Sequence, residues 1–130
     1  MKLTPDIIEQ VVDRMLDIWE DESRWVKGYI AQRRDGAETA YADPFAVSWC
    51  AVGTRMKAMY DLGLRDWYDR DFDRFMDYYA HQEYGVSTVV LNDRDETSFE
   101  DIRLFVKCLK DKPWPVEGVE CEEESSPQPA

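Results

Sequence analysis

The predicted core of this chain is framed by two short segments, Trp49-Cys50-Ala51-Val52-Gly53 and Leu91-Asn92-Asp93, the second followed by Thr97. The first segment lies in a helical pattern, where a glycine costs about 1 kcal/mol relative to alanine. Close approach of another element to this helix would offset that cost, because glycine has no side chain in the way. We therefore predict that Gly53 is a helix-contact residue that packs against the segment containing Asn92.

The polar pair Asn92 and Asp93 precedes the last predicted helix. Short polar side chains in such a place satisfy backbone groups around a turn and a helix entry, and we predict this structural role for both. A calcium loop is excluded, because an EF-hand counted from Asp93 needs glycine and glutamate where the chain has Ser98 and Leu104. We predict no metal site and no cofactor.

Four segments carry apolar residues at three- and four-residue steps, so we predict four helices around one core. Each has a start or stop signal in its sequence. The predicted helices run from Thr4-Pro5 to about residues 21–24, from Asp43-Pro44 to about Gly63, from about Arg65 to Tyr84, and from Thr97 to Pro113. The last begins with a predicted capping box, in which the side chains of Thr97 and Glu100 each bond the other residue's amide.

A different pattern lies between the first and second predicted helices. Residues 25–31 are compatible with a β-strand, Arg34-Asp35-Gly36 is a turn signal, and Glu38-Thr39-Ala40-Tyr41 can return as a second strand. Because an isolated hairpin is marginal in water, we expect this one to pack on the helices or to pair elsewhere.

With the spacing between them, these segments resemble a family of small, uncharacterised bacterial and phage proteins. That family has a Trp-Cys-Ala-x-Gly helix, then an Asn-Asp step, then a final helix led by threonine, as residues 49–53, Asn92-Asp93 and Thr97 do here. The resemblance covers roughly Trp25 to Lys110 and implies a shared fold, and the family brings no established activity. Residues 86–91 can form either a strand or a short buried helix, and the resemblance favours the helix.

These elements predict an α+β fold that is mainly α, with about four helices and one β-hairpin. Residues 1–112 form the predicted single domain. Residues 113–130 are rich in Pro, Glu and Ser and hold almost nothing to bury, so we predict a disordered acidic C-terminal tail.

Charge is the unusual bulk property of the chain: 28 Asp and Glu against 16 Lys and Arg give a net charge of −12. Such a field repels nucleic acid and anionic membranes and steers the protein toward basic surfaces. We therefore predict no direct binding to nucleic acid or to a membrane. The three cysteines lack metal-ligand spacing and the N-terminus lacks a signal-peptide pattern, which together predict a cytoplasmic protein.

The residue types of a cysteine-nucleophile triad are present in Cys50, His81 and Asn92 or Asp93. A reactive cysteine usually gains its thiolate from a helix N-terminus or a cationic neighbour. The predicted second helix puts Cys50 about two turns from its start, where neither aid is evident. A structural Cys50 is therefore favoured, and no catalytic residue is assigned.

The third predicted helix carries the acidic surface most open to a functional interpretation. Its carboxylates can occupy a basic surface where phosphates would otherwise lie. The simpler interpretation is a solvated face of ion pairs, because Arg70 and Arg74 stand at in-helix pairing distance. The predicted partner-binding residues are Asp66, Asp69, Asp73 and Asp77.

These observations predict a non-enzymatic, acidic protein-binding module. The acidic charge predicts a partner with a basic surface. The resemblance to phage proteins implies a phage or mobile-element accessory protein, which would block such a surface on a nucleic-acid-handling host-defence protein. The alternative is a small enzyme or ligand-binding protein with a pocket around Cys50 and Asn92-Asp93. A surface acidic patch without a cavity would favour the first, and a cleft where Cys50, His81 and Asp93 converge would favour the second.

Overall fold

The computed structural model describes residues 3–64 and 66–113 of the chain, without the side chains of Asp66 and Trp67. The predicted tail from residue 114 onward lies outside the described residues. The helices are α1 Pro5–Ile18, α2 Ala51–Asp61, α3 Asp66–Tyr84, α4 Thr88–Asp93 and α5 Phe99–Cys108, with short 3-10 turns at η1 Glu22–Arg24 and η2 Leu109–Asp111; the strands are β1 Ala31–Arg33, β2 Glu38–Thr39 and β3 Ala46–Trp49. The predicted α+β, mainly helical fold is confirmed.

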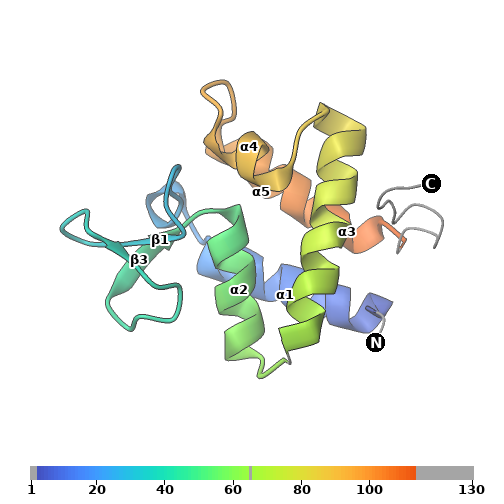
Figure 1. The fold of residues 1–130 in the computed structure, drawn as a ribbon, viewed down its shortest axis with the longest axis horizontal. Helices are drawn as coiled ribbons and strands as arrows, with labels where there is room; N and C mark the ends of the chain where they lie inside the picture. Colours follow the sequence, from blue (N-terminus) through green and yellow to red (C-terminus); the bar gives the residue numbers. More distant parts are fainter. Residues whose placement is uncertain (1–2, 65, 114–130) are drawn as a thin grey trace.

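The helices pack around α1, which contacts α2 and α5. In Figure 1, α1 runs behind α2 and α3, while the sheet lies at one end of the molecule beside α2. The predicted start of α1 is confirmed: Thr4 is the N-cap, its hydroxyl accepts the Ile7 N–H, and Pro5 follows. The largest fully buried side chains come from α1, α3, α4, α5 and the residues that follow α1 and α5, among them Met15, Trp19, Phe72, Phe75, Leu91, Ile102 and Leu109.

The sheet has three antiparallel strands in the order β2-β1-β3. The predicted hairpin exists, with its turn at residues 34–36, but its first strand begins only at Ala31. The third strand replaces the predicted start of the second helix at Asp43-Pro44. Asp43 caps a turn there: one carboxylate oxygen accepts the Phe45 N–H at 2.9 Å, and the other pairs with Arg33 Nε at 2.7 Å.

Helix α2 consequently begins at Ala51, with Cys50 as its N-cap, and the prediction that Cys50 lies two turns into the helix is wrong. The predicted close approach at Gly53 exists, but its neighbour is Ile30 and not the segment containing Asn92. A Cβ added to Gly53 would lie 2.0 Å from the Ile30 carbonyl oxygen. That carbonyl also accepts the Cys50 N–H at 3.3 Å, so the strand entering β1 is held directly against the first turn of α2.

The C-terminal helices settle two further sequence-based predictions. Residues 86–91, which the sequence left open, lead into and form most of helix α4. The capping box at the start of α5 exists but is shifted by one residue, since it joins Ser98 to Asp101. Thr97 is buried instead, and its hydroxyl accepts a hydrogen bond from Arg94 Nε at 2.9 Å. Among the residues described, no helix has the length and apolar character needed to cross a membrane.

Candidate functional site: a pocket between residues 28–30, α2 and α4

The site is organised by Asn92, whose side chain is 1% exposed near the end of α4. Its carbonyl oxygen accepts the Trp25 indole N–H at 2.7 Å and the Ala51 N–H at 3.0 Å. Its amide nitrogen donates to the Val26 carbonyl at 3.1 Å and to Asp93 at 2.8 Å. Because Ala51 is the first residue of α2, Asn92 satisfies one of the amides that a helix start leaves without an internal partner.

Asp93 fixes the next part of the same loop. Its Oδ1 atom accepts the Gly28 N–H at 2.9 Å, in addition to the bond from Asn92. Gly28 has φ 87°, a left-handed conformation that favours glycine. Beside it, Lys27 Nζ donates to the Arg94 carbonyl at 2.6 Å. The predicted role of Asn92 and Asp93 thus takes a specific form, in which they hold residues 25–28 against α4.

Trp49, from the first sequence segment, ties the sheet to the same region. Its carbonyl accepts the Trp19 indole N–H at 3.1 Å and the Val26 N–H at 3.3 Å. Its own indole N–H donates to the Tyr41 carbonyl at 2.9 Å. The strand β3 therefore enters α2 from a fixed position, which also fixes Cys50.

Cys50 is 8% exposed, and its sulfur accepts the Gly53 N–H at 3.3 Å. Burial raises the pKa of the Cys50 thiol above its ordinary value, and the negative charge of Asp93 acts in the same direction. The N–H groups of Gly53 and Val52 favour the thiolate but do not offset the burial. The thiol is therefore protonated at neutral pH, which is the opposite of what an activated nucleophile requires.

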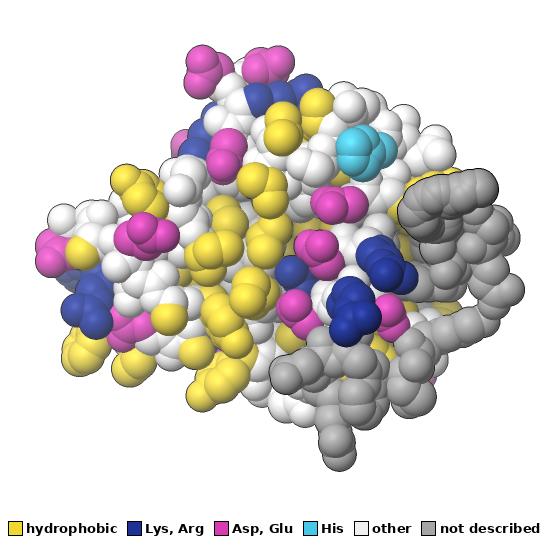
Figure 2. Space-filling model, in the orientation of Figure 1, with side chains coloured by type: hydrophobic (Ala, Val, Ile, Leu, Met, Phe, Trp, Pro, Cys, Tyr) yellow, Lys and Arg dark blue, Asp and Glu magenta, His cyan; other side chains and the backbone are white. Residues whose placement is uncertain are grey.

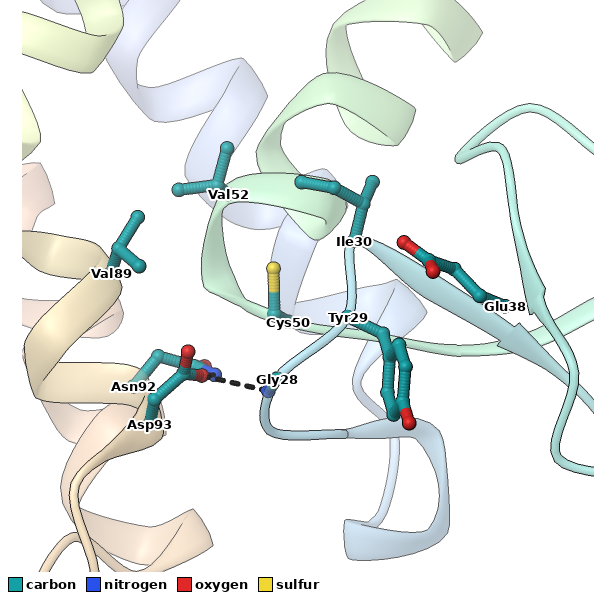
Figure 3. A pocket seen from close by; sticks show the side chains of 9 residues that line it. All are labelled: Gly28, Tyr29, Ile30, Glu38, Cys50, Val52, Val89, Asn92 and Asp93. Carbon is teal, nitrogen blue, oxygen red and sulfur yellow. Dashed lines mark hydrogen bonds between the residues drawn. The ribbon is translucent and has the colours of Figure 1, made fainter.

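A pocket of about 170 Å³ lies where these elements meet. In Figure 3, Cys50 projects its sulfur into the middle, with Asn92 and Asp93 from α4 on one side and residues 28–30 on the other. Val52 and Val89 close the upper walls in that view. The lining is completed by Glu38 of β2. One side of the pocket is therefore apolar, and its polar groups are acidic or uncharged.

The structure brings Cys50 together with Asn92 and Asp93, but it does not bring His81 to them. His81 is exposed in the last turn of α3 and does not line the pocket. The described residues contain no group of three or more His, Cys, Asp or Glu side chains that could hold a metal ion.

Three of the four predicted partner-binding aspartates of α3 have intramolecular partners. Arg55 of α2 is 2% exposed, and its guanidinium pairs with the carboxylate of Asp69 and, at 3.5 Å, with that of Asp73. Asp77 accepts the Thr88 N–H at 2.9 Å and so caps the neighbouring helix α4. The side chain of Asp66 lies outside what the structure describes.

Sequence reasoning missed the role of Arg55. A single arginine within the apolar pattern of α2 was the available signal, because a buried guanidinium requires a carboxylate or carbonyl partner.

Burial raises the pKa of Asp73 despite the opposing charge of Arg55, and the neighbouring Asp77 and Asp69 raise it further.

Sequence reasoning also missed the apolar border of the pocket. Tyr29 is 41% exposed and Val89 of α4 is 52% exposed, and both line the pocket. Figure 2 shows hydrophobic side chains gathered down the middle of one face, over α2 and toward α4, with acidic side chains on both sides. We use the term pocket face for the residues that line the pocket, of which Tyr29 and Val89 are the exposed apolar ones.

No family model, curated protein or solved structure matches this chain, so the resemblance drawn from the sequence segments stays a prediction.

Proposed function

We propose that this protein is a non-enzymatic binding protein whose partner presents a basic surface, and that the pocket face makes the contact. The observation that carries the proposal is the combination of an exposed acidic group, Asp93, with exposed apolar side chains around a preformed pocket. On a chain with a net charge of −12, this surface attracts a cationic partner.

The composition of the pocket face supports a protein partner. Contiguous exposed apolar side chains bordered by polar groups are typical of interaction sites. Binding energy at such sites concentrates in a few anchors that fill well-packed pockets, while surrounding charges set orientation and association rate. Tyr29 and Val89 supply exposed apolar area here, and the pocket between them offers a place for an anchor.

The state of Cys50 supports binding in preference to catalysis. A buried thiol with a raised pKa is a poor nucleophile, and the pocket contains no histidine to deprotonate it. The cysteines Cys50 and Cys108 carry free thiols in the described chain, which fits our proposal that the protein acts in the cytoplasm.

The contact surface in this proposal differs from the face of α3 that the sequence favoured. Asp69, Asp73 and Asp77 already serve Arg55 and Thr88 and are only partly exposed. The proposed class of target remains a nucleic-acid-handling defence protein, whose lysines and arginines bind phosphates. The carboxylates of this chain can compete for such sites.

The test is affinity capture from the native host with the tagged protein, followed by purification of the captured partner and calorimetric titration. A double variant, Asp93→Asn with Val89→Ser, removes one charge and one exposed apolar group from the pocket face. The matched control, Asp111→Asn with Leu104→Ser, also removes one charge and one exposed apolar group, but from positions outside the pocket face.

We expect a basic partner whose affinity falls about tenfold or more with the pocket-face variant and little with the control. Association should also slow as salt rises, because the steering charges are screened. Equal effects of the two variants, or an affinity that does not respond to salt, would reject this surface.

The second candidate function is a small-ligand-binding protein, which the presence of Cys50 and Asp93 in the lining of one pocket favours. Binding of a small molecule with no macromolecular partner in the capture experiment would support it over the first.

A further inference from the structure

We infer that the pocket is a receptor for the side-chain ammonium of a lysine on the partner, with Asp93 as the counter-charge. The inference rests on the proposed function, since it names the group of the basic partner that the pocket holds.

The carboxylate of Asp93 is only half used by the fold. Both bonds that it accepts, from Gly28 N–H and from Asn92, go to the same oxygen, Oδ1. Within the described chain, Oδ2 has no hydrogen-bond or ion-pair partner. Figure 3 shows one carboxylate oxygen of Asp93 turned toward Gly28 and the other toward the space below Val89. A cation that enters the pocket therefore meets an oriented carboxylate oxygen.

This arrangement favours lysine over arginine. Arginine binds carboxylates best as a planar fork that uses both oxygens, but Oδ1 of Asp93 already accepts two hydrogen bonds. An ammonium is a compact charge that can bond a single oxygen. Asp93 thus offers the geometry that a lysine can use and an arginine cannot use fully.

The walls of the pocket suit the rest of a lysine side chain. Ile30 and Val52 supply an apolar lining across the pocket from Asp93, and Val89 of α4 adds an apolar wall on the same side as Asp93. The methylene stem of a lysine buries well against such surfaces while its charged end reaches a polar group. Cys50 is a neutral thiol in the middle of the pocket and adds no competing charge.

A divalent cation is a poorer occupant. Calcium takes six to eight oxygen ligands and magnesium demands an octahedral set, whereas the described residues hold no cluster of three or more acidic, cysteine or histidine ligands. The other carboxylate in the lining, Glu38, lies in Figure 3 beyond Ile30, on the opposite side of the pocket from Asp93.

The inference is tested with three capped amino acids, the N-acetyl, N-methylamide derivatives of lysine, arginine and norleucine, titrated into the full chain labelled with ¹⁵N. Norleucine has an unbranched apolar stem without the ammonium, so it isolates the charge. The backbone amide of Gly28 reports on Asp93, and that of Val89 reports on the pocket wall.

We expect saturable shifts of both amides with the lysine derivative and binding several-fold weaker with the other two. Asp93→Asn keeps an oxygen that can accept the Gly28 N–H but removes the charge, and it should weaken the lysine derivative about tenfold or more. Asp95→Asn, an exposed acid near Asp93 that does not line the pocket, is the matched control and should have little effect.

The absence of saturable shifts in the wild-type chain would overturn the inference. So would equal binding of the lysine and norleucine derivatives, or equal effects of Asp93→Asn and Asp95→Asn. The proposed function can fail separately: lysine binding without any basic partner in the capture experiment would reject the function and leave the lysine pocket. A basic partner whose affinity falls with the double pocket-face variant but not with Asp93→Asn alone would reject the lysine pocket and leave the proposed function.

Discussion

The aspartates of α3 and Asp93 at the end of α4 have the same side chain, but they differ in whether their charge is paired within the protein. The carboxylates of Asp69 and Asp73 pair with the buried guanidinium of Arg55, and Asp77 caps a neighbouring helix. Asp93 is exposed, uses one oxygen to hold a loop, and leaves the other at a pocket. The sequence favoured α3 for partner binding and a structural role for Asp93. The donors around a carboxylate therefore decide whether its charge remains available to another molecule.

Asn92 and its neighbour Asp93 should differ strongly in how much their substitution lowers the free energy of unfolding. Asn92→Leu removes the partner of the Trp25 indole N–H, the Ala51 N–H and the Val26 carbonyl, so we expect a loss of about 3 kcal/mol in the free energy of unfolding. Asp93→Asn should change this free energy by less than about 1 kcal/mol, because an acceptor for Gly28 remains. Urea unfolding measures both. A stable Asn92→Leu variant would mean that the loop is held by other contacts.

The next effect concerns the shape of the pocket region. Gly53→Ala places a methyl group against the Ile30 carbonyl, which must move, and overpacking of this kind typically costs about 2 kcal/mol. Because Ile30 also lines the pocket, binding of the lysine derivative should weaken in the same variant, whereas the ion pairs of α3 should not change. Thermal unfolding together with the ¹⁵N titration checks this. Unchanged stability would show that β1 can retreat from α2 at little cost.

A smaller effect is expected from the α3 side of the comparison. The double variant Asp69→Asn with Asp73→Asn removes the counter-charges of Arg55, and we expect a destabilisation of about 1 kcal/mol, since both carboxylates are nearly half exposed and screened by solvent. Affinity for the partner should stay at the wild-type value. A variant that keeps its stability and loses its partner would restore α3 as the binding surface.

The smallest effect is a pH dependence of the stability, and it comes from Asp43 in the turn before β3. Hydrogen bonds from the Thr39 hydroxyl, the Phe45 N–H and Arg33 lower the pKa of Asp43 from 3.8 to about 2. A carboxyl whose pKa is lower in the folded state stabilises the fold above its ordinary pKa, and this contribution is lost as the pH falls toward the folded value. As the pH falls between these two values, the melting temperature of Asp43→Asn should therefore fall less than that of the wild type. Parallel curves would contradict the role of this turn.

Local signals in the sequence were sufficient for several elements. Thr4-Pro5 begins α1, the turn at residues 34–36 closes the hairpin, and the glycine at position 53 marks a close approach between elements. Each of these depends on neighbouring residues or on a single backbone requirement.

The failures arise where distant residues decide the outcome. Asp43-Pro44 has the composition of a helix start, but Asp43 is held in a turn by Arg33 and Thr39 from the hairpin, and the following residues pair with β1. In the same way, Arg55 selects the aspartates of α3, which the sequence of α3 alone cannot reveal. The site could be anticipated as the meeting of Cys50 with Asn92-Asp93, but its apolar border and the orientation of Asp93 depend on the folded arrangement.

The hydrogen bonds of Asn92 also constrain the order in which the chain can complete its fold. The first amide of α2 finds its acceptor 41 residues later in the chain, and the indole of Trp25 finds the same acceptor after 67 residues. During synthesis, the residues of the sheet and of α2 are therefore made before the residue that completes their hydrogen bonds. A nascent chain that ends before α4 contains the pocket residues at positions 28–30, in β2 and at the start of α2, but it lacks Val89, Asn92 and Asp93, so the pocket can form only after Asp93 has been synthesised.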